Sequence, residues 1–190
     1  MINKIFFLLL LFVFFFILNL NHELFSNYIK KINKKKIIKY TNLNANKSYK
    51  LEKNCLERLQ KNFKCICKDK KQHFPKIVKT YEGKKYYIIE MTNIGKSINK
   101  IKEKKNINKE LIDEQIKCIL HNLEKSKVTH LDMHNTGKNM TLNDNILGLI
   151  DFNAAIIDGN PESDKIRNKY EKTKKNNKNQ FMNILNRIMK

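Results

Sequence analysis

Residues 129–155, THLDMHNTGKNMTLNDNILGLIDFNAA, contain two aspartates, Asp132 and Asp151, each beside apolar residues and with asparagines between them. In proteins Mg²⁺ takes one or two carboxylates, often with an amide oxygen. Phosphoryl transfer needs such an ion together with a base that orients the attacking hydroxyl. Asp132, Asn139 and Asp151 are therefore candidates for the base, the amide ligand and the metal carboxylate. Two carboxylates at this spacing are also common as solvated surface groups or helix caps, so the spacing alone does not distinguish a functional site from these.

The hydrophobic periodicity around this stretch predicts an α+β protein. Apolar residues at helical spacing indicate amphipathic helices, and β-branched or aromatic runs indicate strands. Asn108 is expected to cap the second helix. The expected order is a strand in 34–42, a helix over 47–63, strands at 76–81 and 85–91, a helix over 108–125, a hairpin of 139–142 with 146–152, and a last amphipathic helix that carries Phe181.

The N-terminal segment 5–18 is an uninterrupted apolar run of fourteen residues. It is short for a spanning helix, which needs about 20 residues, and it also fits the apolar region of a signal peptide. No small-x-small cleavage site follows, so an uncleaved signal anchor is favoured over a cleaved signal peptide or a buried helix. Lysines are concentrated behind the segment, and the positive-inside rule then places the body in the cytosol of a single-pass membrane protein.

The chain has 190 residues, 41% of them hydrophobic, and a formal net charge of +21. This length suits one folded domain. The expected division is an anchor over 1–21, a basic linker over 22–33, a core over 34–160, and a charged tail with an amphipathic helix over 161–190. The charge favours anionic partners such as headgroups, nucleic acid or nucleotides, although solvated lysines with no specific partner also explain it.

Four cysteines occur, at 55, 65, 67 and 118. Cys65 and Cys67 are separated by one residue, which is not the spacing of a zinc knuckle, and no second Cys/His pair in the sequence completes such a site. Cys55 and Cys118 fall on the apolar faces of expected helices. Free buried thiols in a reducing compartment are therefore expected, with disulfides as the alternative for a secreted chain.

The segments HLDM and LIDFN, with an asparagine between them, resemble the catalytic loop and the metal-binding segment of the protein-kinase-like superfamily. The resemblance extends backwards in the same order over residues 34–157. The helix 108–125 is similar to the helix before the catalytic loop, YYIIEM to the strand and hinge, LEKNCLERLQ to the regulatory helix, and KKIIKY to the strand with the phosphate-binding lysine. Because these elements are in order, the resemblance is more specific than any single motif.

The resemblance implies a minimal kinase-like fold and an ATP- and Mg²⁺-dependent transfer of a phosphoryl group to a Ser or Thr hydroxyl. Asp132 would be the base, with His130 supporting the loop or moving a proton. Lys39, positioned by Glu52, would contact phosphates, although Lys36 is a rival for this role and Glu52 has Lys47 and Lys53 on its own helix face. The other implied roles are Asn139 and Asp151 as metal ligands, Ile89 as gatekeeper, and Glu90 and Met91 as backbone contacts to adenine.

The chain departs from the family pattern in four places. No glycine precedes Gly83, so the glycine-rich loop is missing. Asn139 follows Asp132 by seven residues where the family usually has five, with Asn135 as a substitute ligand. Asn153 replaces the glycine of D-F-G, and the A-P-E motif is absent. These departures leave two alternatives open: a catalytically impaired pseudokinase that serves as a membrane-tethered binding module, and a small-molecule kinase of the same superfamily. A basic nucleic-acid-binding protein would explain the charge but not the ordered motifs, so no nucleic acid is expected.

Overall fold

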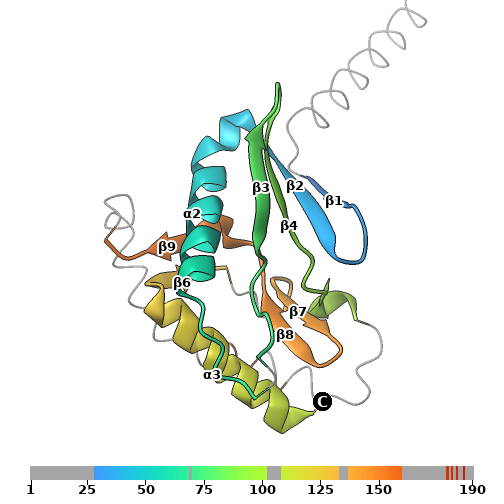
Figure 1. Cartoon of the computed structure of the whole chain (residues 1–190), viewed down its shortest axis with the longest axis vertical. Helices are drawn as coiled ribbons and strands as arrows, with labels where there is room; N and C mark the ends of the chain where they lie inside the picture. Colours follow the sequence, from blue (N-terminus) through green and yellow to red (C-terminus); the bar gives the residue numbers. More distant parts are fainter. Residues whose placement is uncertain are drawn as a thin grey trace, which may run out of the picture.

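The computed structural model describes residues 28–68, 70–101, 108–132 and 137–159, with positions 179, 181, 183 and 186 near the end of the chain. The described residues have an α+β fold, as predicted, and their strands form three antiparallel sheets (Figure 1). The strands are β1 (Tyr28–Lys31), β2 (Lys36–Asn42), β3 (Ile77–Glu82), β4 (Tyr86–Thr92), β5 (Lys96–Ser97), β6 (Val128–His130), β7 (Met140–Asn143), β8 (Ile146–Leu149) and β9 (Ala155–Ile157). The two long helices are α2 (Asn46–Asn62) and α3 (Lys109–Lys125), and three 3₁₀ turns are η1 (Leu43–Ala45), η2 (Ile98–Lys100) and η3 (Phe152–Ala154).

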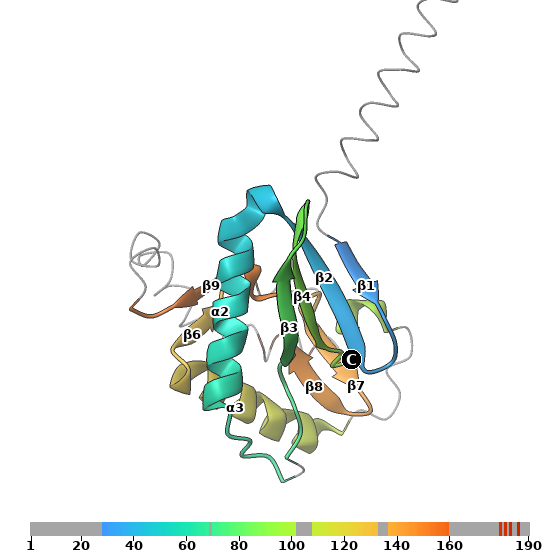
Figure 2. The same ribbon diagram turned by 45° about the horizontal axis from the view of Figure 1, so that its top comes forward.

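The largest sheet has the strand order β1-β2-β4-β3, and α2 runs beside it in both views (Figure 1 and Figure 2). Helix α2 contacts β2, β3 and β4. Its buried face is Tyr49, Glu52, Cys55, Leu56 and Leu59, the periodicity expected of an amphipathic helix. Tyr49 also stacks on Tyr87 of β4 at 4.4 Å between ring centroids. A charged side chain, Glu52, therefore lies in a helix face that is otherwise apolar except for a tyrosine hydroxyl.

Helix α3 begins where the sequence predicted, because the side chain of Asn108 accepts a hydrogen bond from the backbone N–H of Leu111 at 3.1 Å. Two of its buried side-chain amides bind neighbouring backbone reciprocally. Gln115 donates to the carbonyl of Asn145 and accepts from the N–H of Leu147. Asn122 accepts from the N–H of Lys64 and donates to its carbonyl. These amides dock α3 against β8 and against the loop that follows α2.

The hydrophobic core lies between α2, α3, β8 and η3. Its largest fully buried side chains include Phe152 and Phe181. The buried Phe181 agrees with the apolar face expected for the last helix. The hairpin β7–β8 turns through Asp144 and Asn145, whose φ values of 48° and 61° are those of a tight two-residue connection that Asn and Asp tolerate.

Some elements differ from the expectation. The sheet begins at Tyr28, inside the segment 22–33 that was expected to be a linker, because β1 pairs with β2 from Tyr28–Tyr40 to Lys31–Ile37. The short pair β6–β9 was not expected, since three-residue strands carry little periodicity. Within the described ranges, no helix has the length and apolar character required to cross a membrane. The expected anchor over 1–21 lies outside the described residues, as do positions 160–178 of the tail.

Candidate functional site

Lys39 occupies the centre of β2, on the face that packs against α2. Strand alternation buries Lys39 and Thr41 on this face and leaves Tyr40 less buried. The Lys39 Nζ lies 2.7 Å from Glu52 Oε2, and the two side chains are only 9% and 3% exposed. Two of the rival lysines are paired elsewhere: Lys36 binds Glu90 at 2.8 Å, and Lys53 lies 3.7 Å from Glu57. The expected pairing of Lys39 with Glu52 is therefore present in the structure.

Asp151 meets the same lysine from a third segment, just beyond β8. Its Oδ1 lies 2.7 Å from Lys39 Nζ, and its side chain is 29% exposed. The backbone of Asp151 is left-handed, with φ 66° and ψ 69°. Strain of this kind is found preferentially at functional sites, and Asp tolerates it better than most residues do. Asn153, which stands at the position of the D-F-G glycine, is not among the described residues with positive φ.

The electrostatics of this group follow from its burial. Burial disfavours the Lys39 ammonium, but the carboxylates of Glu52 and Asp151 outweigh it and raise the pKa of Lys39 above its usual value. Burial raises the pKa of Glu52, and the Lys39 charge opposes that shift. The backbone N–H of Phe152 also hydrogen-bonds Glu52. Glu52 therefore holds both the lysine and the residue next to Asp151.

The loop after β6 brings Asp132 and Asn139 together despite the long spacing between them. Asn139 Nδ2 donates to the Asp132 carbonyl at 2.7 Å and to Asp132 Oδ2 at 3.0 Å. Asn139 is 3% exposed. Because its Nδ2 already donates to Asp132, the amide oxygen is the atom that can bind a cation. Asn135 lies outside the described residues.

His130 is buried between this loop and the end of β8. Its Nδ1 accepts from the N–H of Asp132 at 3.2 Å, so the proton lies on Nε2, which donates to the Ile150 carbonyl at 2.9 Å. Burial lowers the pKa of His130, so the ring is neutral at pH 7. Both ring nitrogens are thus used to position the backbone beside Asp132 and Asp151, which corresponds to the supporting role rather than to proton transfer.

The segment expected to contact adenine is the end of β4. Ile89, fully buried, lies opposite Lys39, while Glu90 and Met91 lie opposite Ile38 and Ile37. The Glu90 carboxylate binds Lys36 on the sheet surface, so the Glu90 side chain is occupied and only its backbone is relevant to the expected role.

An open cleft of about 510 Å³ lies between the β1–β2 turn, the segment after β4 and the β7–β8 hairpin. It is lined by Lys31, Lys34, Asn93, Gly95, Lys96, Ile101, Leu142, Asn143 and Asp144. None of these lining residues is an expected site residue. We therefore identify the candidate site by the convergence of charged groups at Lys39 and Asp151 and not by this cleft.

Sequence reasoning missed a second convergence, of three cysteines and a histidine. Cys65, Cys67, His73 and Cys118 lie with their ligand atoms within 4.8 Å of one another. The spacing of Cys65 and Cys67 did not indicate this group, because its other two members, His73 and Cys118, do not form a second closely spaced pair. The available signal was His73 in the same loop as the two cysteines.

Comparison with known proteins does not identify a family. No family model matches the chain, and no curated protein matches it. Among solved structures it is similar to one described as "Crystal structure of monomeric WbdD", with a TM-score of 0.45 and 16% sequence identity. That match covers 66% of this chain and 32% of the other, so the matched part is about a third of the length of that protein.

Proposed function

We propose that this chain is a minimal phosphotransferase of the protein-kinase-like type, which uses ATP and Mg²⁺ to phosphorylate a Ser or Thr hydroxyl. One observation carries the proposal: Lys39 lies 2.7 Å from both Glu52 and Asp151, although the three residues come from a strand, a helix and a strand end. Burying the charges of Lys39 and Glu52 is costly unless they are paired, and the resemblance in sequence assigned roles to these two residues and to Asp151.

The chemistry of the donor set supports Mg²⁺. A carboxylate at Asp151 and an amide oxygen at Asn139 are hard oxygen ligands of the kind that Mg²⁺ takes beside substrate phosphates. When bound, the ion would neutralise charge on the transferred phosphoryl group. Glu52 keeps the Lys39 ammonium beside Asp151, where it would contact the phosphates.

Asp132 is the proposed base. Asn139 holds its carboxylate through Oδ2, and its backbone N–H is held by His130. A hydroxyl that approaches this carboxylate would be oriented for attack and would transfer its proton to it. The two extra residues between Asp132 and Asn139 do not prevent their contact, which supports the assignment of Asn139 over Asn135 as the amide ligand.

The test uses the full chain, purified in mild detergent. Mg-ATP should raise its melting temperature, followed by circular dichroism, and Asp151→Asn should abolish the shift. Asp132→Asn should retain the shift and lose transfer of labelled phosphate to protein or peptide hydroxyls. Asp113→Asn, which alters a carboxylate 46% exposed on α3, is the control that should leave both unchanged. A folded protein that neither shifts nor turns over would refute nucleotide binding.

One observation favours the alternative, a catalytically impaired pseudokinase that acts as a binding module. The turn between β1 and β2 is built by Asn33, whose side chain accepts from the N–H groups of Lys35 and Lys36, and the chain has no glycine before Gly83. A glycine-rich cover over the phosphates is therefore missing. A Mg-ATP shift with no turnover on protein, peptide or small-molecule hydroxyls would select this alternative. Turnover on small molecules alone would select a small-molecule kinase.

The proposal includes a location. Residues 1–21 would anchor the protein as a single-pass membrane protein, with the folded body in the cytosol. Sedimentation of the full chain with membranes after carbonate washing should require residues 1–21, and protease added outside sealed vesicles should reach the body only if it faces the cytosol.

A further inference from the structure

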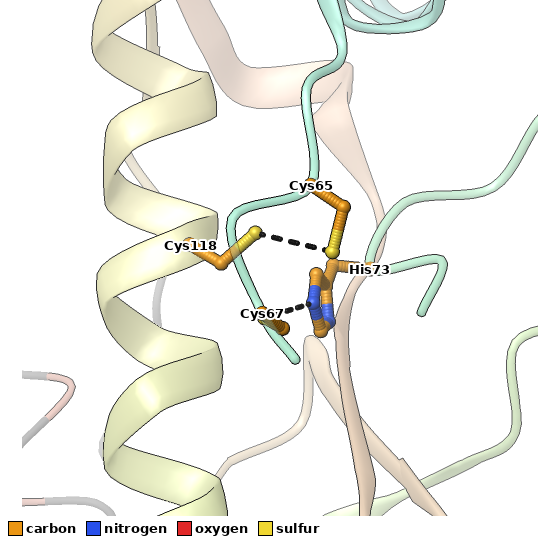
Figure 3. Close-up of side chains that lie close together, drawn as sticks. All are labelled: Cys65, Cys67, His73 and Cys118. Carbon is orange, nitrogen blue, oxygen red and sulfur yellow. Dashed lines mark hydrogen bonds between the residues drawn. The ribbon is translucent and has the colours of Figure 1, made fainter. Parts of the chain in front are cut away.

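Two segments, the loop after α2 and helix α3, bring four metal-ligating side chains to one point, away from Lys39 and Asp151. Cys65 and Cys67 come from the loop after α2, His73 lies further along the same loop, and Cys118 projects from α3 (Figure 3). Their ligand atoms all lie within 4.8 Å of one another. Cys67, His73 and Cys118 are buried and Cys65 is half-buried, so the group is almost closed to solvent.

Two of the distances between donor atoms are close to the edges of a tetrahedral site. With Zn–S near 2.3 Å and Zn–N near 2.0–2.1 Å, the edges of such a tetrahedron are about 3.8 Å between sulfurs and about 3.5 Å between sulfur and nitrogen. The Sγ atoms of Cys65 and Cys118 are 3.8 Å apart, and Cys67 Sγ lies 3.2 Å from His73 Nε2. These two pairs are near tetrahedral spacing, and the remaining pairs, all within 4.8 Å, need only small shifts to surround one ion.

The surrounding hydrogen bonds prepare the ligands. The His73 Nδ1 lies 2.7 Å from the Leu147 carbonyl, which can only accept, so Nδ1 carries the proton and the lone pair of Nε2 is directed at the cysteines. Asn122 Nδ2 donates to Cys118 Sγ at 3.6 Å, and the backbone N–H of Ile66 also binds that sulfur. A histidine fixed by a backbone carbonyl and a sulfur held by N–H donors are the typical surroundings of bound zinc.

We propose that Cys65, Cys67, His73 and Cys118 form a structural Zn²⁺ site. Three soft thiolate donors with one imidazole select zinc over the hard cations that prefer oxygen. Four protein ligands fill the tetrahedron and leave no open position for a substrate, which is typical of a structural and not a catalytic ion.

Two simpler interpretations explain less. Isolated buried thiols are common, and Cys55 is one, but chance burial does not direct a histidine lone pair at three thiols. A disulfide between Cys65 and Cys118 would require the sulfurs to approach from 3.8 Å to about 2.05 Å. It would also leave Cys67 and His73 without a role.

The ion would fasten the loop to two other elements. Cys118 brings in α3, and His73 brings in β8, because its ring binds the Leu147 carbonyl and its own carbonyl accepts from the N–H of Leu149. The site therefore joins segments that are distant in sequence. This inference does not depend on the proposed phosphotransferase function.

The test measures metal content. The untagged full chain, produced in zinc-supplemented medium and purified in detergent without chelator, should contain equimolar zinc by plasma mass spectrometry. Cys65→Ser and Cys67→Ser should each lose most of it, whereas Cys55→Ser, which alters a buried thiol outside the group, should retain it. Cys65 is the ligand least involved in packing, so Cys65→Ser is the variant best able to fold. Circular dichroism checks the fold of each variant.

Cobalt provides a second readout that distinguishes binding here from binding elsewhere. Replacement of zinc by Co²⁺ should give the sulfur-to-cobalt charge-transfer bands and the intense visible bands of a tetrahedral thiolate site, weakened in each cysteine variant. Folded protein without zinc and without these bands would overturn the proposal. So would zinc that persists in the Cys65→Ser/Cys67→Ser double variant, or an intact mass lowered by two hydrogens, which reports a disulfide.

Discussion

Replacing Lys39 by methionine should lower the free energy of unfolding by far more than the 2.7 Å length of its ion pairs would suggest, because one partner is buried. Methionine preserves much of the apolar stem but removes the charge between Glu52 and Asp151. The Glu52 carboxylate, 3% exposed, then has no counterion and little access to water. Removing one partner from a buried ion pair costs about 3–5 kcal/mol of unfolding free energy, and we expect Lys39→Met to fall in this range.

The stability lost in Lys39→Met comes from the unpaired Glu52 carboxylate and not from Asp151. The Asp151 side chain is 29% exposed and can be hydrated when the lysine is lost. Adding Glu52→Gln to Lys39→Met removes the stranded charge, so the double variant should be more stable than the sum of the single losses by about 2–3 kcal/mol. The deficit of Lys39→Met should also shrink as the pH falls from 7 to 5. Burial already raises the pKa of Glu52, and without the ammonium that pKa rises further, so acid restores a neutral side chain.

The measurement is urea unfolding of the full chain in detergent, followed by far-ultraviolet circular dichroism, because the chain has no tryptophan. Lys36→Met is the matched control. Lys36 lies 2.8 Å from Glu90, but these side chains are 43% and 18% exposed, and such a pair contributes about 1 kcal/mol or less. Equal losses for Lys39→Met and Lys36→Met would refute the argument from burial, as would a double variant whose loss is the simple sum.

Three further predictions concern other parts of the fold. Gly148→Ala should destabilise the protein by about 1–3 kcal/mol in the same urea assay, because a Cβ there would lie 2.5 Å from the hydroxyl of the buried Thr141; an unchanged midpoint would contradict the close packing. Asn108→Ala should cost about 1 kcal/mol through loss of the cap on the Leu111 N–H, whereas Asn108→Ser should restore most of it. Burial raises the pKa of Cys55 from 9.0 to about 12, which lowers its thiolate population at pH 8 by roughly a thousandfold; alkylation followed by mass spectrometry should therefore modify Cys55 only when the protein unfolds.

The elements that the sequence predicted well are those with strong local signals. The two long helices have clear apolar stripes, and Asn108 is a good cap, so α3 began at the expected residue. The strand containing Lys39 was found because β-branched residues surround it. The strands that were missed, β6 and β9, have three residues each and depend on partners that are distant in the sequence. Non-local pairing of this kind leaves almost no periodic signal.

The same distinction holds for the candidate site. An order of motifs was enough to select Lys39, Glu52 and Asp151, but only the structure shows that Lys36 binds Glu90 instead of Glu52. The cysteine group was missed for a related reason. Cys118 lies on a different element from Cys65, and fifty-three residues separate the two sulfurs that lie 3.8 Å apart.

The two amides of α3 have a consequence for the uniqueness of the folded state. An apolar stripe such as Ile112, Ile116 and Ile119 fits a hydrophobic surface almost equally well if the helix slides along its axis by one turn. Gln115 and Asn122 prevent this sliding. Each side-chain amide hydrogen-bonds both a backbone N–H and a backbone carbonyl of a neighbouring segment, and these bonds form at only one position along the helix axis. A slipped helix would leave four hydrogen bonds unmade, at about 1–3 kcal/mol for each buried group left unpaired. Two uncharged side chains thus select one register of α3 among several that apolar contacts alone would allow.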